Sequence, residues 1–208
     1  MSALIKTICL VRHGATGYND QDLFQGLLDN SLSERGIQES EKLALRLKHE
    51  AVDIIFHSPL TRARQTAEII NQYHQAELCQ VDGFIEMDMG EWEGLNFFKV
   101  IKEQAEIYQQ LESDPGAKVP GGESFDQVFQ RVRSGVDKVM ASKEKSILIS
   151  AHAMVNLAIL GHLLGLEPIK ARKFRMENCA FSRFLLYRTL EGENTVMDTW
   201  NSVDHLRT

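Results

Sequence analysis

The chain has 208 residues, of which 43% are apolar and 25% are charged, and its formal net charge is −6 at pH 7. These values are typical of a globular protein with a substantial core, and we expect residues 1–208 to form a single domain. The acidic balance argues against general binding of nucleic acid or of an anionic membrane surface.

Three cysteines, Cys9, Cys79 and Cys179, lie far apart and form no Cys-x-x-Cys pair. This pattern does not indicate a disulfide framework or a thiolate zinc site, and it favours a reducing, cytoplasmic location. The first residues run directly into an apolar stretch, so we expect no signal peptide. No apolar run approaches the length of a membrane span.

Strand-like and helix-like segments alternate through the first 81 residues. Apolar runs predict strands at residues 5–11, 53–57 and 78–81. Ser33 is placed to cap a helix over residues 34–49, and Ser58 with Pro59 predicts the start of a second helix that ends near residue 73. On the first helix, the inward-facing side chains are expected to be Ile37, Leu43, Ala44 and Leu47.

Residues 89–122 look like an excursion from the main sheet, because helical stretches and two turn-rich segments replace the alternating pattern. We expect this excursion to lie over the active site like a lid. Its aromatic side chains could shape a pocket for an organic substrate, although an ordinary small core is the simpler interpretation of each one. These residues are Trp92, Phe97, Phe98 and Tyr108.

After the excursion, Ser124 and Gln127 form a capping-box pattern that opens another helix with regular apolar spacing. A strand over 146–150, a helix over 153–164 and two strands near 180–187 and 195–200 follow. The alternation predicts an α/β fold, a three-layer sandwich whose mostly parallel sheet has helices on both faces.

The parallel strands end in residues that can bind and attack a phosphate. Arg12 and His13 follow the first strand, Arg62 lies in the first turn after the second, and His152 follows the strand over 146–150. Because ligands of such sheets bind beyond the carboxyl ends of the strands, these side chains are expected to share one pocket near two helix N-termini. A guanidinium binds phosphate well and a neutral imidazole can attack it, so a small phosphorylated ligand fits this pocket.

Clustered histidines could instead bind a metal. Arg12 and Arg62 would repel a divalent cation, however, and no His-x-x-x-His or acidic ligand set completes a site. We therefore expect neither a metal nor another cofactor.

Four carboxylates lie within eight residues, between Glu86 and Glu93. Most are expected to be ordinary surface groups. A phosphate ester also needs a proton donor for its leaving oxygen, and the pKa of a carboxyl group rises near a phosphate dianion. One of the four is therefore a candidate general acid.

Five segments in order resemble the signature of the histidine phosphatase superfamily, the phosphoglycerate mutase-like family, over about residues 5–165. They are Leu10-Val11-Arg12-His13-Gly14-Ala15-Thr16, Ser58-Pro59-Leu60-Thr61-Arg62-Ala63-Arg64-Gln65-Thr66-Ala67, Glu86 with Gly90-Glu91-Trp92-Glu93-Gly94, Pro120-Gly121-Gly122-Glu123-Ser124, and Ser150-Ala151-His152.

By this resemblance, His13 is the nucleophile and becomes a transient phosphohistidine, and Glu86 is the proton donor. Arg12, Arg62 and His152 would hold the phosphoryl oxygens. The resemblance also implies that Asn19, Gln25 and Gly26 belong to a loop that closes over the phosphate, although Asn19 could equally be a turn residue. Ala153 stands where the family often has glycine and is assigned to substrate binding with them.

The segment from Glu86 to Gly94 resembles the α-ribazole phosphatase and broad-specificity phosphatase branch. The resemblance therefore implies a metal-independent phosphomonoester hydrolase that acts on a small phosphorylated metabolite. Two alternatives remain: a phosphotransferase of the cofactor-dependent phosphoglycerate mutase type, and a phosphate-binding sensor without catalysis. The sequence does not indicate the physiological substrate or the oligomeric state.

Overall fold

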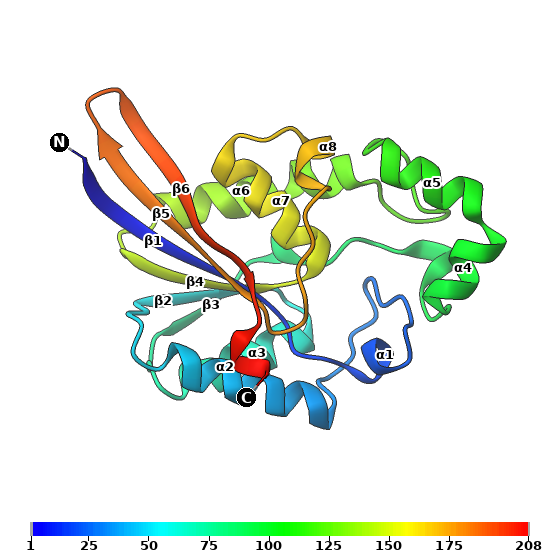
Figure 1. Ribbon diagram of the computed structural model, residues 1–208, viewed down its shortest axis with the longest axis horizontal. Helices are drawn as coiled ribbons and strands as arrows, with labels where there is room; N and C mark the ends of the chain where they lie inside the picture. The colour runs from blue at the N-terminus through cyan, green and yellow to red at the C-terminus, as the bar shows by residue number, and fades with distance from the viewer. Residues whose placement is uncertain (1, 208) are drawn as a thin grey trace.

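The computed structural model describes residues 2–207 and arranges them as one six-stranded sheet between two layers of helices (Figure 1). The strand order is β3-β2-β4-β1-β5-β6. Strands β1 to β4 are parallel, β5 is antiparallel to β1, and β6 is antiparallel to β5. The expected three-layer α/β fold with a mostly parallel sheet is confirmed. The strands are β1 Ala3–Arg12, β2 Ile54–His57, β3 Glu77–Gln80, β4 Ser146–Ala151, β5 Phe181–Thr189 and β6 Gly192–Ser202.

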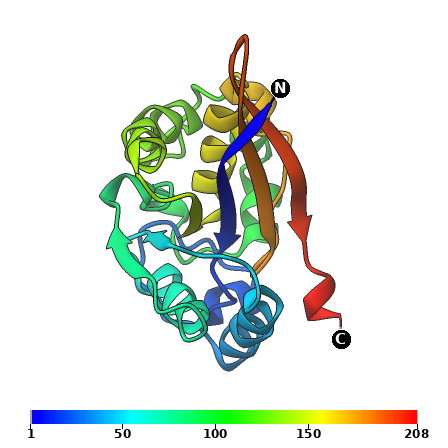
Figure 2. The same ribbon diagram turned by 90° about the vertical axis from the view of Figure 1, so that its left-hand side faces the viewer.

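Helices α2 and α3 cover one face of the sheet, and α6 and α7 cover the other (Figures 1 and 2). Strand β1 serves both layers because successive side chains of a strand point to opposite faces. Ile8 and Leu10 join the core under α6 and α7, whereas Cys9 and Val11 join the core under α2 and α3. The helices are α1 Gly17–Asp20, α2 Glu34–Leu47, α3 Thr61–Asn71, α4 Phe97–Glu103, α5 Ala105–Ser113, α6 Phe125–Ala141, α7 Ala153–Leu164 and α8 Pro168–Ala171, with short 3-10 turns at Asp82–Phe84, Gly90–Trp92 and Asp204–Leu206.

Two of the three predicted helix caps are confirmed. The Ser33 hydroxyl accepts from the N–H of Gly36, and Ser124 forms the expected capping box with Gln127. The prediction for Ser58 was wrong, since α3 begins at Thr61 and its N–H is capped instead by Asp29, from a distant loop, at 2.6 Å.

Helix α2 also corrects one prediction about its inward face. Ile37 is 42% exposed, because the buried stripe runs one residue earlier, through Gly36, Ser40, Leu43, Ala44 and Leu47. A Cβ on Gly36 would overlap the carbonyl group of Ala15. Glycine at this position therefore lets the start of α2 pack directly against the loop that follows β1.

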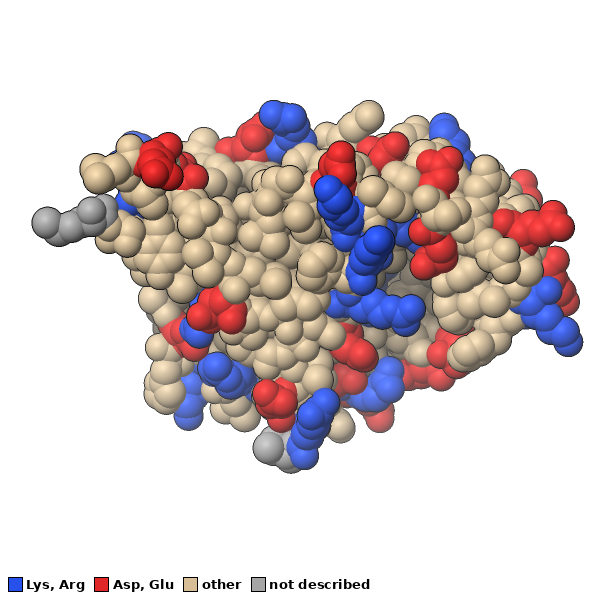
Figure 3. Space-filling model, turned by 45° about the horizontal axis from the view of Figure 1, so that its top comes forward, with Lys and Arg blue, Asp and Glu red and all other residues tan. Residues whose placement is uncertain are grey.

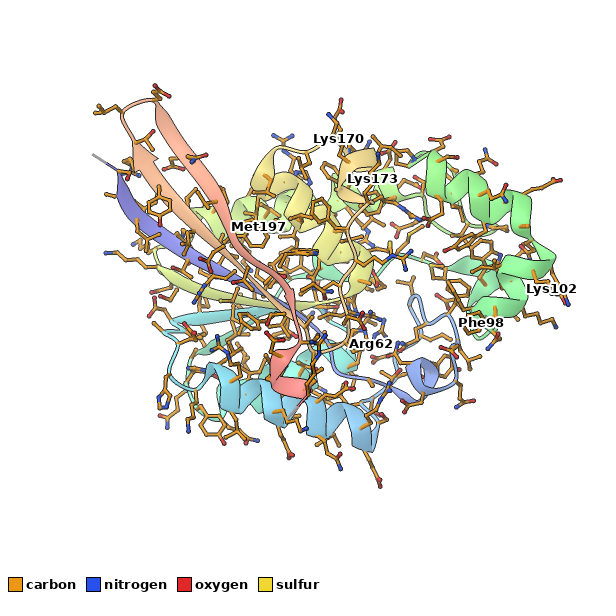
Figure 4. The ribbon with its side chains drawn as sticks, in the orientation of Figure 1. Arg62, Phe98, Lys102, Lys170, Lys173 and Met197 are labelled. Atoms are coloured by element: carbon orange, nitrogen blue, oxygen red, sulfur yellow. The ribbon has the colours of Figure 1, made fainter. Side chains whose placement is uncertain are left out.

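The excursion over residues 89–122 contains α4 and α5, which lie beyond the carboxyl ends of the strands (Figure 1). Trp92 is 1% exposed and packs with Phe24 and Tyr108, at ring-centre distances of 5.4 and 6.4 Å. It forms a small aromatic core, whereas Phe98 is 63% exposed and points away from the interior (Figure 4). Among residues 2–207, none of the helices is both long enough and apolar enough to span a bilayer.

Candidate active site

The sheet register brings the ends of three strands together. Arg12 pairs with Ala151 across β1 and β4, and His57 pairs with Ser150 across β2 and β4. The next N–H groups continue this pattern, because His13 donates to the Ala151 carbonyl at 3.0 Å and Ser58 donates to the Ser150 carbonyl at 3.1 Å. The residues that follow each strand, among them His13, Ser58 and His152, therefore meet at one edge of the sheet.

His13 is only 2% exposed, and its ring is held by its neighbour. Nδ1 lies 2.7 Å from the carbonyl oxygen of Gly14, which can only accept, so Nδ1 carries the proton and Nε2 presents a lone pair. Burial is the main cause that holds the pKa of His13 well below its ordinary value, and the cations Arg62 and Arg12 act in the same direction. A neutral imidazole with a free lone pair on Nε2 is the form that is able to act as a nucleophile.

The two arginines are fixed by backbone carbonyl groups. Arg12 donates from Nη1 to the Met176 carbonyl at 2.8 Å. Arg62 is 1% exposed and donates to the carbonyl groups of Leu28 and Gly26 at 2.7 and 2.9 Å. Burial lowers the pKa of Arg62 to about 10, so it remains a cation at neutral pH. Figure 4 shows Arg62 beside the end of the sheet that faces the excursion.

His152 lies beside His13, with ring centres 5.2 Å apart, and is itself fully buried. Its Nε2 lies 2.7 Å from the Ser58 hydroxyl, which accepts a hydrogen bond from the Leu60 N–H. If the hydroxyl proton is given to Nε2, the His152 proton resides on Nδ1. Burial is again the main cause that keeps the pKa of His152 well below its ordinary value.

Three buried nitrogen atoms around the site have no hydrogen-bond partner within the described part of the chain. They are Nε of Arg12, Nε of Arg62 and Nδ1 of His152. Buried donors without partners are costly, typically by about 1–3 kcal/mol each, and an anion with several acceptor oxygens would satisfy them. Two of the three belong to guanidinium cations, so the arrangement favours a phosphate-like group.

Glu86 enters the site from the loop after β3. One carboxylate oxygen accepts from the N–H of Met87 at 2.9 Å, and the other lies 3.4 Å from the N–H of Met154 at the start of α7. Arg131 of α6 stabilises this loop, because it donates to the carbonyl group of Glu86 at 2.8 Å.

Arg131 is in turn held by Glu123, to which it donates two parallel hydrogen bonds of 2.9 and 3.0 Å. Burial opposes ionisation of Glu123, but the hydrogen bonds from Arg131 and from the Asp88 N–H outweigh it, so the pKa of Glu123 is below its ordinary value. The Gly121-Gly122-Glu123 turn, at the end of the excursion, is thereby tied to the Glu86 loop.

The residues assigned to substrate binding line one cavity of about 210 Å³ with His13, Arg12, Arg62 and Glu86. These residues are Asn19, Gln25, Gly26 and Ala153. Asn19 fits both earlier interpretations, because it lines the cavity and also closes a capping box with Thr16. Of the predicted site residues, His152 alone is not part of the cavity wall and meets the site through its ring contact with His13.

Ser58 and Arg131 were not among the predicted site residues. Ser58 was predicted to be a helix cap, although its position directly after β2 places it at the same edge as His13. No sequence pattern indicated that Arg131 contacts Glu86, since the two residues are more than forty positions apart in the chain. Among residues 2–207, no three His, Cys, Asp or Glu side chains are grouped so as to hold a metal ion.

The comparisons with known proteins agree with this geometry. A family model described as histidine phosphatase superfamily (branch 1) matches residues 8–202. Phosphoserine phosphatase 1 of Hydrogenobacter thermophilus is 32% identical over 181 residues, which are 86% of this chain and 85% of that protein.

Two further comparisons represent other named activities. A protein named as a probable phosphoglycerate mutase, from Photorhabdus laumondii, is 29% identical over 97% of this chain and 95% of its own length. The crystal structure of the α-ribazole phosphatase from Shigella flexneri superimposes with a TM-score of 0.82 at 26% identity, covering 95% of this chain and 96% of that one.

Proposed function

The chain belongs to the histidine phosphatase superfamily and is a phosphatase, and from this premise we propose a metal-independent phosphomonoester hydrolase that works through a phosphohistidine on His13. The observation that carries the proposal is the combination of a neutral His13, whose Nε2 is free to attack, with three buried nitrogen atoms that have no hydrogen-bond partner among residues 2–207. Small phosphorylated metabolites are the proposed substrates, in keeping with the names of the similar phosphoserine and α-ribazole phosphatases.

In the first step, the phosphoryl group of the ester lies among Arg12, Arg62 and His152. Nε2 of His13 attacks phosphorus while the bond from phosphorus to the ester oxygen breaks. Glu86, in its acid form, gives its proton to the departing oxygen. Charge-assisted hydrogen bonds from the guanidinium groups stabilise the charge on the phosphoryl oxygens as the transition state forms.

In the second step, a water molecule attacks the phosphorus of the phosphohistidine. Glu86, now ionised, accepts a proton from this water, and inorganic phosphate leaves. His13 returns to its neutral form because the Gly14 carbonyl keeps the Nδ1 proton in place throughout. The net reaction consumes one ester and one water and yields one alcohol and one phosphate.

We also propose that the excursion over residues 89–122 acts as the cover of the site. Its aromatic core is joined to the loop after α1, because the Phe24 N–H donates to the Leu95 carbonyl at 3.0 Å and Leu23 pairs with Asn96. The loop after α1 carries Gln25 and Gly26, which line the cavity. The cover and the phosphate-binding loop are therefore expected to move together.

The test is hydrolysis of p-nitrophenyl phosphate with a chelator present, combined with a mass measurement after an alkaline quench. Phosphohistidine is expected to add one phosphoryl group to the wild-type protein but not to a His13→Ala variant, whose turnover falls by at least about 10³-fold. The exposed His49 provides a matched control, and His49→Ala should retain both signals. Turnover that stops with metal removal would refute the metal-independent mechanism.

Measurements of ester turnover and of its products also separate the two alternative functions, the sensor and the phosphotransferase. A phosphate sensor would bind inorganic phosphate without turning over any ester. A phosphotransferase of the mutase type, incubated with 3-phosphoglycerate and its bisphosphate, would yield the isomer, whereas the proposed hydrolase is expected to release phosphate.

A further inference from the structure

A second cavity adjoins the one that holds the catalytic groups. The inner cavity measures about 210 Å³ and the outer one about 570 Å³, and both are lined by Arg12, Ala153 and Met154. The inner cavity has room for a phosphoryl group and for the first atoms of the leaving group. Because Glu86 reaches the N–H of Met154, the oxygen that leaves near Glu86 lies at the border between the two cavities. The remainder of a substrate therefore has the outer cavity beside it.

The outer cavity combines apolar walls with charged side chains of both signs. Phe97 and Ile101 of α4 line it, as do Leu157 of α7 and Phe174. Its charged lining comprises the cations Arg12, Arg172 and Arg175 and the carboxylates Glu112 and Glu177. On the face shown in Figure 3, Lys and Arg side chains gather beside a hollow, although acidic groups also occur around it.

Arg172 is held in a fixed position. Its Nη2 lies 2.8 Å from the carboxylate of Glu112, its guanidinium carbon lies 5.6 Å from the ring centre of Phe125, and its side chain is only 12% exposed. Glu112 therefore offsets part of the positive charge of Arg172 and fixes its guanidinium group in the wall of the cavity.

Arg175 differs from Arg172 because its side chain is exposed and has no ion pair in the described part of the chain. Its backbone is nevertheless anchored, since its carbonyl group accepts from the indole N–H of Trp200 at 3.0 Å. Both arginines act on the phenol of Tyr108, whose pKa is raised mainly by burial and lowered in part by the two cations. A phenolic hydroxyl and two guanidinium groups thus face the same space.

We propose, on the basis of the hydrolase function above, that Arg175, with Arg172 and Tyr108, recognises a second anionic group on the leaving group of the substrate. The preferred substrates are then phosphomonoesters that carry another oxyanion, either a carboxylate or a second phosphate. The apolar wall accommodates the carbon chain between the two charged groups. Arg175 is the specificity-determining residue, because Arg12 also lines the inner cavity and Arg172 is paired with Glu112, whereas Arg175 has no ion pair among residues 2–207.

The experiment measures kcat/KM for four esters: 3-phosphoglycerate, glycerol 3-phosphate, propane-1,3-diol bisphosphate and p-nitrophenyl phosphate. The wild-type enzyme is expected to prefer 3-phosphoglycerate or the bisphosphate to glycerol 3-phosphate by about 10-fold or more, as one charge-assisted hydrogen bond provides. The relative rates on the carboxylate and on the bisphosphate show which oxyanion fits.

The variant Arg175→Gln should lower the ratio of kcat/KM for the preferred anionic ester to kcat/KM for p-nitrophenyl phosphate by about 10-fold. The matched control is Lys173→Gln, which removes one charge from the same segment but does not line the cavity and lies away from Arg62 in Figure 4. Equal rates of the wild-type enzyme on charged and uncharged leaving groups, or an Arg175→Gln variant that keeps this ratio, would overturn the proposal.

Failure of the hydrolase function gives a different result, because no ester would then be turned over. In that case, calorimetric measurement of the affinity for 3-phosphoglycerate still tests whether Arg175 binds a second anionic group. Weaker binding to Arg175→Gln than to Lys173→Gln supports the subsite, and equal binding refutes it.

Discussion

The hydroxyl of Ser58 lies 2.7 Å from Nε2 of His152, and neither side chain is exposed to solvent. Ser58 follows β2 and His152 follows β4, so the contact depends on the pairing of two strands that are more than eighty residues apart in the chain. We interpret Ser58 as a positioning residue, which holds the His152 ring so that its Nδ1 proton is available to a bound phosphoryl group.

Removal of this hydroxyl should disturb the His152 proton. In Ser58→Ala, kcat/KM is expected to fall by about 10-fold, because Nε2 loses its hydrogen-bond donor and the other tautomer becomes accessible. The ¹⁵N shifts of His152 report the tautomer directly. Ser150→Ala removes a similarly buried hydroxyl, which donates to the Ala63 carbonyl at 2.8 Å, and should leave the His152 shifts unchanged. A tautomer identical in both variants would contradict this role.

Glu86→Gln should slow esters according to their leaving group. An alkyl alcohol needs a proton as it departs, so its rate is expected to fall by about 10²–10⁴-fold. p-Nitrophenolate leaves without one, and its rate of release should fall much less. Stopped-flow measurement of the first turnover separates this step from hydrolysis of the phosphohistidine. An equal loss for both esters would show that Glu86 is not the proton donor.

Arg131 is predicted to act on catalysis through Glu86. In Arg131→Met, the Glu86 loop loses its support and kcat for alkyl esters is expected to fall by about 10-fold. A double-mutant cycle with Glu86→Gln provides the readout, because the second substitution should then add little to the first. The nearby exposed Arg133 serves as the control, and Arg133→Met should retain wild-type kcat. Fully additive effects would mean that Arg131 acts only on stability.

The free energy of unfolding of the free enzyme should decrease below about pH 6.5. The pKa values of His13 and His152 are lowered in the folded protein, so between the ordinary value of 6.5 and the folded values only the unfolded chain takes up these protons. Each histidine then costs up to about 1.4 kcal/mol per pH unit. Above pH 6.5 both states are neutral and this contribution disappears.

Urea unfolding between pH 7.5 and pH 5 measures this slope. A His152→Asn variant should have a shallower dependence on pH than the wild-type protein, because one of the histidines whose pKa is lowered most is gone. If the free energy of unfolding depended on pH equally in the wild-type protein and in the variant, His152 would not stay neutral in the folded state.

Local patterns were sufficient to predict much of this protein. Apolar runs predicted the strands, the Ser124–Gln127 capping box predicted the start of α6, and the residues after three strands predicted which side chains share the site. These predictions succeeded because alternation along a strand and capping at a helix N-terminus depend on residues that are neighbours in the chain.

The errors have the opposite cause. Ser58 was predicted from its neighbour Pro59 to be a cap, but a buried histidine from another strand competes for its hydroxyl, and Asp29 caps the helix in its place. Ile37 was predicted to face inward, but the close approach of Gly36 to Ala15 sets the rotation of the helix.

The order of residues along the chain thus determined the fold class, the edge of the sheet where the site lies and the types of residue that occupy it. The contact of His152 with Ser58, the support of Glu86 by Arg131 and the outer cavity were decided only by tertiary structure. The physical reason is that a hydrogen-bond partner, a buried charge and a cavity wall each depend on distances between segments far apart in sequence, which local spacing does not encode.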